Sequence, residues 1–185
     1  ASERVVRMAF RQAEQRRQHV TIVHKANVLR ATGGLFREVA FDVAQAFPGI
    51  QAEEMLVDAA AMRLVRSPEQ FDVIVTTNLF GDILSDEAAG LVGGLGLVPS
   101  ANMGDERAIF EPVHGSAPDI AGRGIANPVA TFFSVAMLLD YLCEEEVATR
   151  VREAVEDILY SGPRTPDLGG KADTSEVTEA VIDRL

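Results

Sequence analysis

Residues 71–99 read FDVIVTTNLFGDILSDEAAGLVGGLGLVP, and this stretch contains both patterns that decide the fold. Its first part, FDVIVTTN, is rich in β-branched residues and predicts a strand. A helix is predicted next, with Asn78 as a plausible cap and a glycine-rich end. Its apolar residues at helical spacing are Phe80, Ile83, Leu84, Leu91 and Val92. A strand that leads directly into a helix is typical of an α/β fold with largely parallel strands.

Towards the N-terminus the alternation of helix and strand continues. The chain opens with a helical pattern at Val5, Val6, Ala9, Phe10 and Ala13. A β-branched run predicts a strand at Val20–His24, followed by a loop that contains Gly33 and Gly34. Helical spacing then extends from Leu35 to Phe47. Asp58 precedes the helical run AAAMRLV and is a candidate helix cap.

Residues 98–128 differ from the rest of the chain because they are dense in Gly, Pro, Asn and Ser. They predict one short strand, near Ala108–Glu111. A long irregular segment inside a compact domain is usually functional. Helices are predicted after it, at about Val129–Tyr141, Glu145–Tyr160 and Ser175–Arg184.

Composition excludes several classes of protein. The 185 residues include 28 acidic and 17 basic side chains, for a net charge of −11. Residues 1–50 carry +4 and residues 51–185 carry −15, and so acidic a chain repels nucleic acid. The longest nearly apolar stretch, Val129–Leu139, is far shorter than the roughly 20 residues that span a bilayer. We therefore expect neither a nucleic-acid partner nor a membrane partner.

Cysteine usage points to a reducing compartment. Cys143 is the only cysteine, so the chain has no internal disulfide, and no Cys/His cluster suggests a structural zinc site. The expected location is the cytoplasm. The sequence has no initiator methionine and begins in a helical pattern, which suggests a fragment.

Asp82 and Asp86 are the first candidates for chemistry. They are four residues apart, so on a helix their carboxylates project from the same face. An exposed acidic face is the simpler interpretation. However, the helix starts at the carboxyl end of a strand, where open α/β sheets place ligands, and small residues follow on the same stripe. Oxygen ligands of this kind suit Mg²⁺ or Mn²⁺.

Lys25 ends a strand, and Asn27 follows two positions later on the same side. A lysine at the end of a strand is most often an edge charge. Near a divalent cation and partly desolvated, its pKa would fall toward neutrality, as a proton-abstracting base requires.

Several common motifs are absent. His114 lies in EPVHGSAPDIAG, but the chain has no GxSxG elbow, no GxGxxG fingerprint and no GxxxxGK[ST] loop. A nucleotide site, if present, is of neither the Rossmann nor the P-loop kind.

Four segments together resemble the β-decarboxylating dehydrogenases that oxidise isopropylmalate, homoisocitrate, isocitrate and tartrate. They are VHKANVL at 23–29, LVDAAAMRLV at 56–65, residues 71–97, and FEPVHGSAPDIAGRGIANP at 110–128. The likeness covers essentially the whole chain. The VHK triplet and the tail GPRTPDLGGKADTSEVTEAV are most similar to homoisocitrate dehydrogenase. The resemblance implies an α/β fold of the isopropylmalate/isocitrate dehydrogenase type.

The resemblance also implies roles for individual residues. Lys25 would take the proton of the substrate hydroxyl, with Asn27 beside it. Asp58, Asp82 and Asp86 would hold Mg²⁺ or Mn²⁺, with Lys25 and Asp58 reaching across a dimer interface into the partner's site. The residues that would line an NAD pocket are Glu111, His114, Gly115, Ser116, Ala117, Asp119, Ile120 and Asn127.

Family members are nearly twice this length. By the resemblance, residues 1–92 belong to an interface and metal-site domain and residues 93–185 to an NAD-binding domain. The segment that supplies the substrate-binding arginines and a tyrosine of the reaction would precede residue 1, so we expect the isolated chain to be inactive.

The leading interpretation is half of an NAD- and metal-dependent dehydrogenase that decarboxylates a small 2-hydroxy acid, homoisocitrate or 3-isopropylmalate, in amino-acid biosynthesis. Isocitrate, tartrate or malate is an alternative substrate within the same family. A lyase or phosphoryl-transfer enzyme that uses Asp82 and Asp86 is an alternative from another class, and a chain that only dimerises is a third. The expected assembly is a homodimer or a dimer of dimers with shared active sites.

Overall fold

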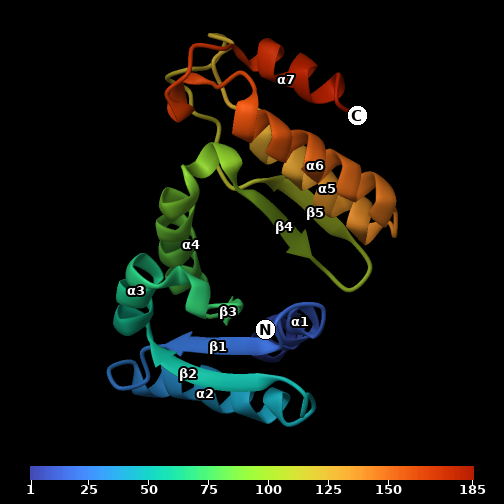
Figure 1. Cartoon of the computed structure of the whole chain (residues 1–185). Helices are drawn as coiled ribbons and strands as arrows, with labels where there is room; N and C mark the ends of the chain where they lie inside the picture. The colour runs from blue at the N-terminus through green and yellow to red at the C-terminus, as the bar shows by residue number, and fades with distance from the viewer. The chain divides into compact units, whose positions relative to one another are not determined.

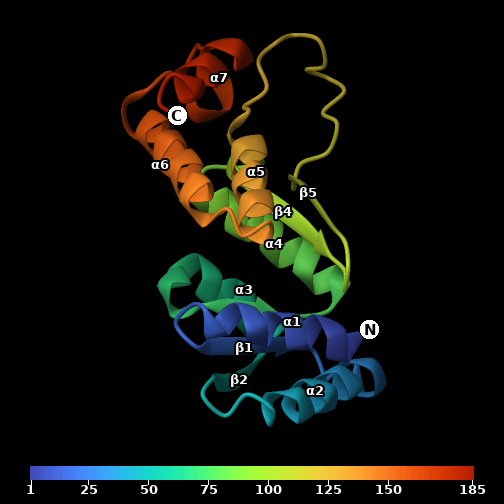
Figure 2. The same ribbon diagram turned by 90° about the vertical axis from the view of Figure 1, so that its right-hand side faces the viewer.

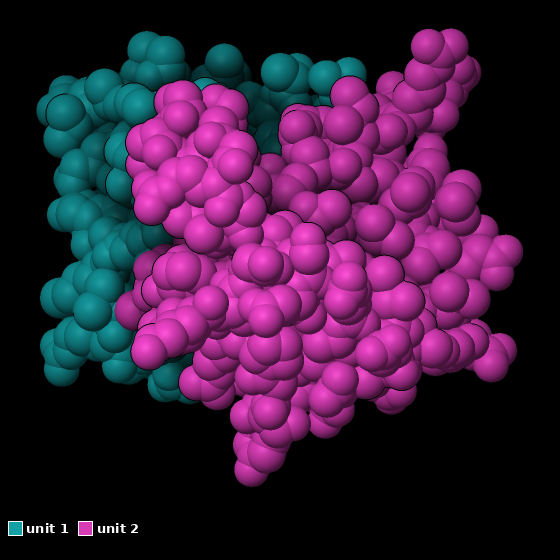
Figure 3. Space-filling model, turned by 90° about the horizontal axis from the view of Figure 1, so that it is seen from above, with its two compact units in different colours: residues 1–88 teal, residues 89–185 magenta.

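The computed structural model describes all 185 residues, which divide into two compact units, residues 1–88 and residues 89–185. Figure 3 colours these units teal and magenta. Each unit mixes helices with strands, as the sequence predicts (Figure 1). None of the helices has the length and apolar content needed to cross a bilayer.

The first unit is built on a parallel sheet of three strands in the order β2-β1-β3. Its strands are β1 (His19–His24), β2 (Gln51–Leu56) and β3 (Val73–Val75). β1 pairs in register with both neighbours, Ile22 opposite Glu54 on one side and Val75 on the other. Five of its six residues are buried, which explains why it is a nearly continuous run of β-branched residues.

Helices cover both faces of this sheet (Figure 2). They are α1 (Ser2–Glu14), α2 (Arg30–Ala44), α3 (Val57–Arg66) and α4 (Asn78–Val92), and α4 continues into the second unit. Val20 and Ile22 of β1 pack with Phe10 of α1 and Phe36 of α2 in one core. Val23, on the opposite face of β1, packs with residues of α3 and α4 in another.

The second unit contains an antiparallel hairpin of β4 (Pro99–Met103) and β5 (Ala108–Pro112), with helices beside it. The helices are α5 (Val129–Tyr141), α6 (Glu145–Ser161) and α7 (Thr174–Ile182). The rings of Phe110 of β5 and Tyr141 of α5 pack at a tilt, with centroids 5.6 Å apart. Val129, Val155 and Val181 are fully or almost fully buried where the three helices meet.

The structure corrects four details of the expected elements. Gly33 and Gly34 do not form a loop, because α2 begins at Arg30 and includes both. Asp58 is not a helix cap: α3 begins at Val57, and Leu56 precedes it without a side-chain cap. The strands β2 and β4 have no counterpart in the prediction. The long segment 98–128 therefore contains a hairpin, and only its second half is irregular.

The buried carboxylate of Asp72, the residue before β3, binds the turn after α1 and the first residue of β1. The side chain of Asp72 is only 1% exposed and accepts hydrogen bonds from Arg16 Nε at 2.9 Å and His19 N at 3.4 Å. Burial acts to raise the pKa of Asp72, but these hydrogen bonds and the charge of Arg16 outweigh it and lower the pKa below its usual value. Asp72 is therefore ionised at neutral pH.

We expect Asp72→Ala to lower the free energy of unfolding by about 1–3 kcal/mol at pH 7, because its donors lose a desolvated acceptor. The folded-state pKa lies below the unfolded-state value, so the stabilisation is full above an unfolded pKa of about 3.9 and disappears as pH falls through the folded pKa. Denaturant unfolding of both proteins between pH 7 and pH 2 tests this. The difference between them should shrink at acid pH, and a constant difference would contradict it.

Candidate functional site

Lys25 and Asp58 lie together because their strands are parallel neighbours. Lys25 directly follows β1, Asp58 comes two residues after β2, and His24 is in register with Leu56. Parallel neighbours end at the same edge of a sheet, which is where α/β folds place ligands. Lys25 Nζ donates a hydrogen bond to Asp58 Oδ1 at 2.5 Å.

The electrostatics of this pair follow from its position. The hydrogen bond from Lys25 lowers the pKa of Asp58, and backbone N–H groups in the first turn of α3 act in the same direction. Asp58 is therefore an ionised, exposed carboxylate that binds the Lys25 ammonium group at the carboxyl end of the parallel strands. Asn27 is exposed in the turn that follows Lys25.

Asp82 and Asp86 are both exposed on α4, one helical turn apart. Two free carboxylates fit the oxygen ligands that Mg²⁺ and Mn²⁺ prefer, with water and substrate completing the shell. No three His, Cys, Asp or Glu side chains of the chain gather closely enough to hold a metal ion. The chain by itself therefore does not bring Asp58 together with Asp82 and Asp86, and the three-aspartate metal set stays a prediction.

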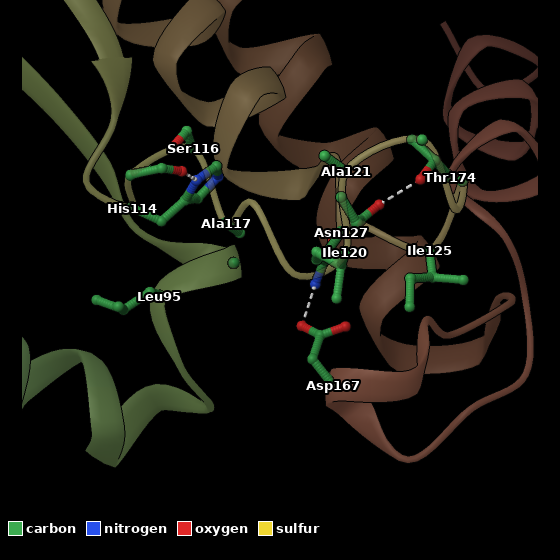
Figure 4. Close-up of a pocket in the computed structure, with 15 residues that line it drawn as sticks. Leu95, His114, Ser116, Ala117, Ile120, Ala121, Ile125, Asn127, Asp167 and Thr174 are labelled. Carbon is green, nitrogen blue, oxygen red and sulfur yellow. Dashed lines mark hydrogen bonds between the residues drawn. The ribbon is translucent and has the colours of Figure 1, made fainter.

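A cavity of about 800 Å³ lies in the second unit, between the loop after β5 and the segment that precedes α7 (Figure 4). Six of the eight residues expected to bind NAD line it: His114, Gly115, Ser116, Ala117, Ile120 and Asn127. The other two do not. Glu111 lies on β5 and accepts a hydrogen bond from Asn102 Nδ2 at 2.9 Å, and Asp119 is exposed in the turn before Ile120.

The cavity also has walls that the prediction did not include. These are Leu95, Gly96, Ala121, Gly122, Gly124, Ile125, Ala126, Asp167 and Thr174. Gly96 is a point of close approach, since a Cβ there would come within 3.0 Å of both Asn127 Cβ and Asp167 Oδ2. The glycine-rich stretch 93–96 is a sequence signal for Gly96. No sequence pattern indicates Asp167, which lies 40 residues after Asn127.

Side-chain and backbone hydrogen bonds hold the loop in its shape. Asn127 Nδ2 donates to Asp167 Oδ2 at 3.0 Å, and Asn127 Oδ1 accepts from Val129 N at the start of α5. Thr174 Oγ1 donates to Ala126 O at 2.6 Å, while Thr174 N donates to Gly124 O at 2.8 Å (Figure 4). The loop therefore surrounds the cavity with apolar walls and a few fixed polar groups, as ligand sites generally do.

The chain is similar to known proteins over its whole length. The model of the family described as "Isocitrate/isopropylmalate dehydrogenase" matches residues 1–181. An isocitrate/homoisocitrate dehydrogenase of Thermus thermophilus is 62% identical over 100% of this chain and 56% of its own length. A homoisocitrate dehydrogenase of Methanocaldococcus jannaschii is 56% identical over 100% of this chain and 53% of its own. The chain thus spans about half the length of these curated relatives.

Solved structures agree with the fold. The isocitrate dehydrogenase from Methylococcus capsulatus matches with a TM-score of 0.94 and 49% identity, over 99% of this chain and 55% of that one. A β-decarboxylating dehydrogenase from Thermococcus kodakarensis matches with a TM-score of 0.90 and 46% identity, over 99% and 54%. The fold type expected from the sequence is confirmed, and the chain belongs to the isocitrate/isopropylmalate dehydrogenase family.

Proposed function

We propose that the full-length protein containing this chain oxidises and decarboxylates a 2-hydroxy acid with a 3-carboxylate, using NAD and Mg²⁺ or Mn²⁺. Homoisocitrate is the preferred candidate substrate and 3-isopropylmalate the second, in the biosynthesis of an amino acid. Relatives named for homoisocitrate and isocitrate support the reaction class. A relative of Methanocaldococcus jannaschii named 3-isopropylmalate/3-methylmalate dehydrogenase, 53% identical, supports the second substrate.

The observation that carries the proposal is the cavity of the second unit. Its volume of about 800 Å³ is within the range of small-molecule and cofactor sites. The loop around it has neither the Rossmann nor the P-loop fingerprint, so a nucleotide there would be bound by a loop of another kind. Apolar walls such as Ile120 and Leu95 suit the flat faces of a nucleotide. Asp167 supplies a carboxylate acceptor, and Ser116 a hydroxyl, for its polar edges.

The polar residues near the carboxyl ends of β1, β2 and β3 suit the chemistry on the substrate, which is proton removal and metal binding. Lys25, in its unprotonated form, would accept the proton of the substrate hydroxyl, and Asn27 would contribute a nearby amide. Asp58, Asp82 and Asp86 would hold the metal ion, which supplies Lewis-acid stabilisation of negative charge on the substrate. NAD would supply the hydride acceptor. Because Lys25 and Asp58 contact each other within one chain, they would enter a partner's site as a pair in the proposed homodimer or dimer of dimers.

The test is NADH formation by the full-length protein with homoisocitrate, 3-isopropylmalate, isocitrate and tartrate, each with Mg²⁺ or with a chelator. We expect metal-dependent NADH formation, highest with homoisocitrate or 3-isopropylmalate. No NADH with any of the four acids, or equal rates with the chelator, would overturn the proposal.

We expect Asp82→Asn or Asp86→Asn in the full-length protein to abolish metal-dependent turnover while leaving the melting temperature unchanged, because both side chains are exposed. Glu87→Gln removes the same charge from the next position of the same helix and serves as the control. Mg²⁺ titrations of all three variants should show weakened metal affinity only in the two aspartate variants. Normal turnover and metal affinity in either would refute its role as a ligand.

Asp119 is expected to select NAD over NADP. The backbone of its turn is held by Ile120 N donating to Ala117 O at 3.1 Å, which leaves the exposed carboxylate free to accept from ribose hydroxyls. The same charge would repel the extra phosphate of NADP, as the acidic ribose ligand of Rossmann enzymes does. We expect a strong NAD preference in kcat/KM, shifted toward NADP by Asp119→Lys with Ile120→Tyr. Equal kcat/KM with both cofactors in the unmodified enzyme would contradict this.

A further inference from the structure

His24 is a buried polar residue at the end of a hydrophobic strand, immediately before Lys25. Its side chain is only 5% exposed. Its Nδ1 lies 3.1 Å from the backbone N of Ala26, the residue after Lys25. A backbone N–H can only donate, so Nδ1 is the unprotonated ring nitrogen and accepts this bond. The proton of the neutral ring is then on Nε2.

A carboxylate and a guanidinium fix the other side of the ring. His24 Nε2 lies 3.1 Å from Glu54 Oε2, and Arg37 of α2 donates to both oxygens of Glu54, with Nη2 at 3.0 Å from Oε1. The hydrogen bond from Arg37 lowers the pKa of Glu54, which keeps Glu54 ionised and able to accept from Nε2. Arg37 in turn lies over the ring of Phe41, 5.3 Å from its centroid.

The register of the sheet makes this network possible. Val20, Ile22 and His24 alternate along β1 and so share a face, the one that packs against α2. Glu54 is in register with Ile22 and is therefore a diagonal neighbour of His24. Arg37 reaches Glu54 from α2 on this same face.

Gly33 of α2 lies against the same peptide from another direction. Gly33 lies so close to the Lys25–Ala26 peptide that a Cβ there would come within 3.1 Å of Ala26 N and 3.3 Å of the Lys25 carbonyl carbon. The Lys25 carbonyl oxygen is also engaged, since it accepts from Val28 N at 3.0 Å and Leu29 N at 2.8 Å. The peptide that directly follows the Lys25 side chain, Lys25–Ala26, is therefore fixed at both its N–H and its carbonyl group.

We infer that His24 and Gly33 are positioning residues that set where the amine of Lys25 lies, His24 by accepting the Ala26 N–H and Gly33 by admitting the peptide against α2. This inference rests on the proposed function, in which Lys25 is the base. A reacting group must be held within a fraction of an ångström, and a 1 Å displacement can cost about a hundredfold in rate. The two contacts on the Lys25–Ala26 peptide limit the displacement of the backbone from which the long, flexible lysine side chain extends.

Two substitutions separate the roles of the two ring nitrogens. In His24→Asn the amide oxygen can still accept from the N–H two residues ahead, as in an Asx turn, so the clamp is kept. In His24→Gln the amide nitrogen can replace Nε2 towards Glu54, but the acceptor at the Nδ1 position is lost. We expect the Gln variant of the full-length enzyme to lose about tenfold to a hundredfold in kcat with an unchanged KM for NAD, and the Asn variant to keep most of its kcat.

His19 provides the matched control on the same strand. It lies 3.5 Å from Glu53 on the opposite face of β1 and at the opposite end from Lys25. His19→Asn and His19→Gln should therefore have equal kcat values. Equal kcat values for His24→Asn and His24→Gln, or a higher value for Gln, would overturn the inference.

Gly33 and Gly34 give a second comparison that does not disturb the buried ring. A Cβ at Gly33 would press on the Lys25–Ala26 peptide, whereas one at Gly34 would meet nothing within 4 Å. We expect Gly33→Ala to lower kcat and Gly34→Ala to leave it unchanged, with both variants folded by circular dichroism. Unchanged kcat in Gly33→Ala would overturn the part assigned to Gly33.

Lys25→Ala distinguishes failure of the inference from failure of the proposed function. If Lys25→Ala abolishes turnover but the His24 and Gly33 variants keep wild-type kcat, only the positioning role is wrong. If Lys25→Ala itself turns over normally, the proposed base is wrong and the positioning role falls with it.

Discussion

The burial of β1 on both faces is the constraint on which the first unit depends. A strand paired on both edges and covered on both faces has little freedom to slide, because a slip of one residue would move each buried side chain out of the closely packed space that it fills. The position of its last residues is therefore fixed by the core. Lys25 follows this strand directly, so the packing of Val20, Ile22 and Val23 determines where its backbone lies.

The second unit contains a long irregular loop whose shape is held mainly by hydrogen bonds. Residues 113–128 have few apolar side chains to bury, so hydrogen bonds at the end of the loop replace a core. Asn127 joins the loop to Asp167 and to the first turn of α5, and Thr174 joins it to α7. A capping box formed by Asp173 and Glu176 orders the start of α7, which keeps Thr174 in place.

The elements that sequence patterns predicted well are those with a strong period or a buried β-branched run. β1, α5 and α6 are of this kind. The sequence of β2, QAEEML, does not predict a strand, because it has two adjacent glutamates whose partners are histidines of the neighbouring strand. The intrinsic propensity of Gly33 and Gly34 predicts a loop, but tertiary packing overrides it, because Gly33 lies in α2 where it admits the Lys25–Ala26 peptide. Neither the glutamate–histidine contacts of β2 nor the approach of Gly33 to the Lys25–Ala26 peptide can be predicted from neighbouring residues in the sequence.

The same reasoning applies to the candidate site. The composition of residues 98–128 marks them as an irregular, functional segment, but the eight residues expected to bind NAD come from the resemblance to the dehydrogenase family; six of them line the cavity. Asp167 was not recognisable, since only the fold brings it to Asn127. The Lys25–Asp58 contact could be predicted only in part. Both residues follow strands, but their contact can be predicted only if β1 and β2 are known to be parallel neighbours.

His24 is a buried polar residue in β1, a strand whose other buried residues are mostly apolar. A buried polar ring costs free energy unless its nitrogens are satisfied, and an apolar residue would continue the face formed by Val20 and Ile22 without that cost. The chain instead satisfies both nitrogens, one with a backbone N–H and one with Glu54. Glu54 in turn requires Arg37. Three polar residues on three different elements are thus committed to fixing one peptide beside Lys25, and local exceptions of this kind are expected where position matters more than stability.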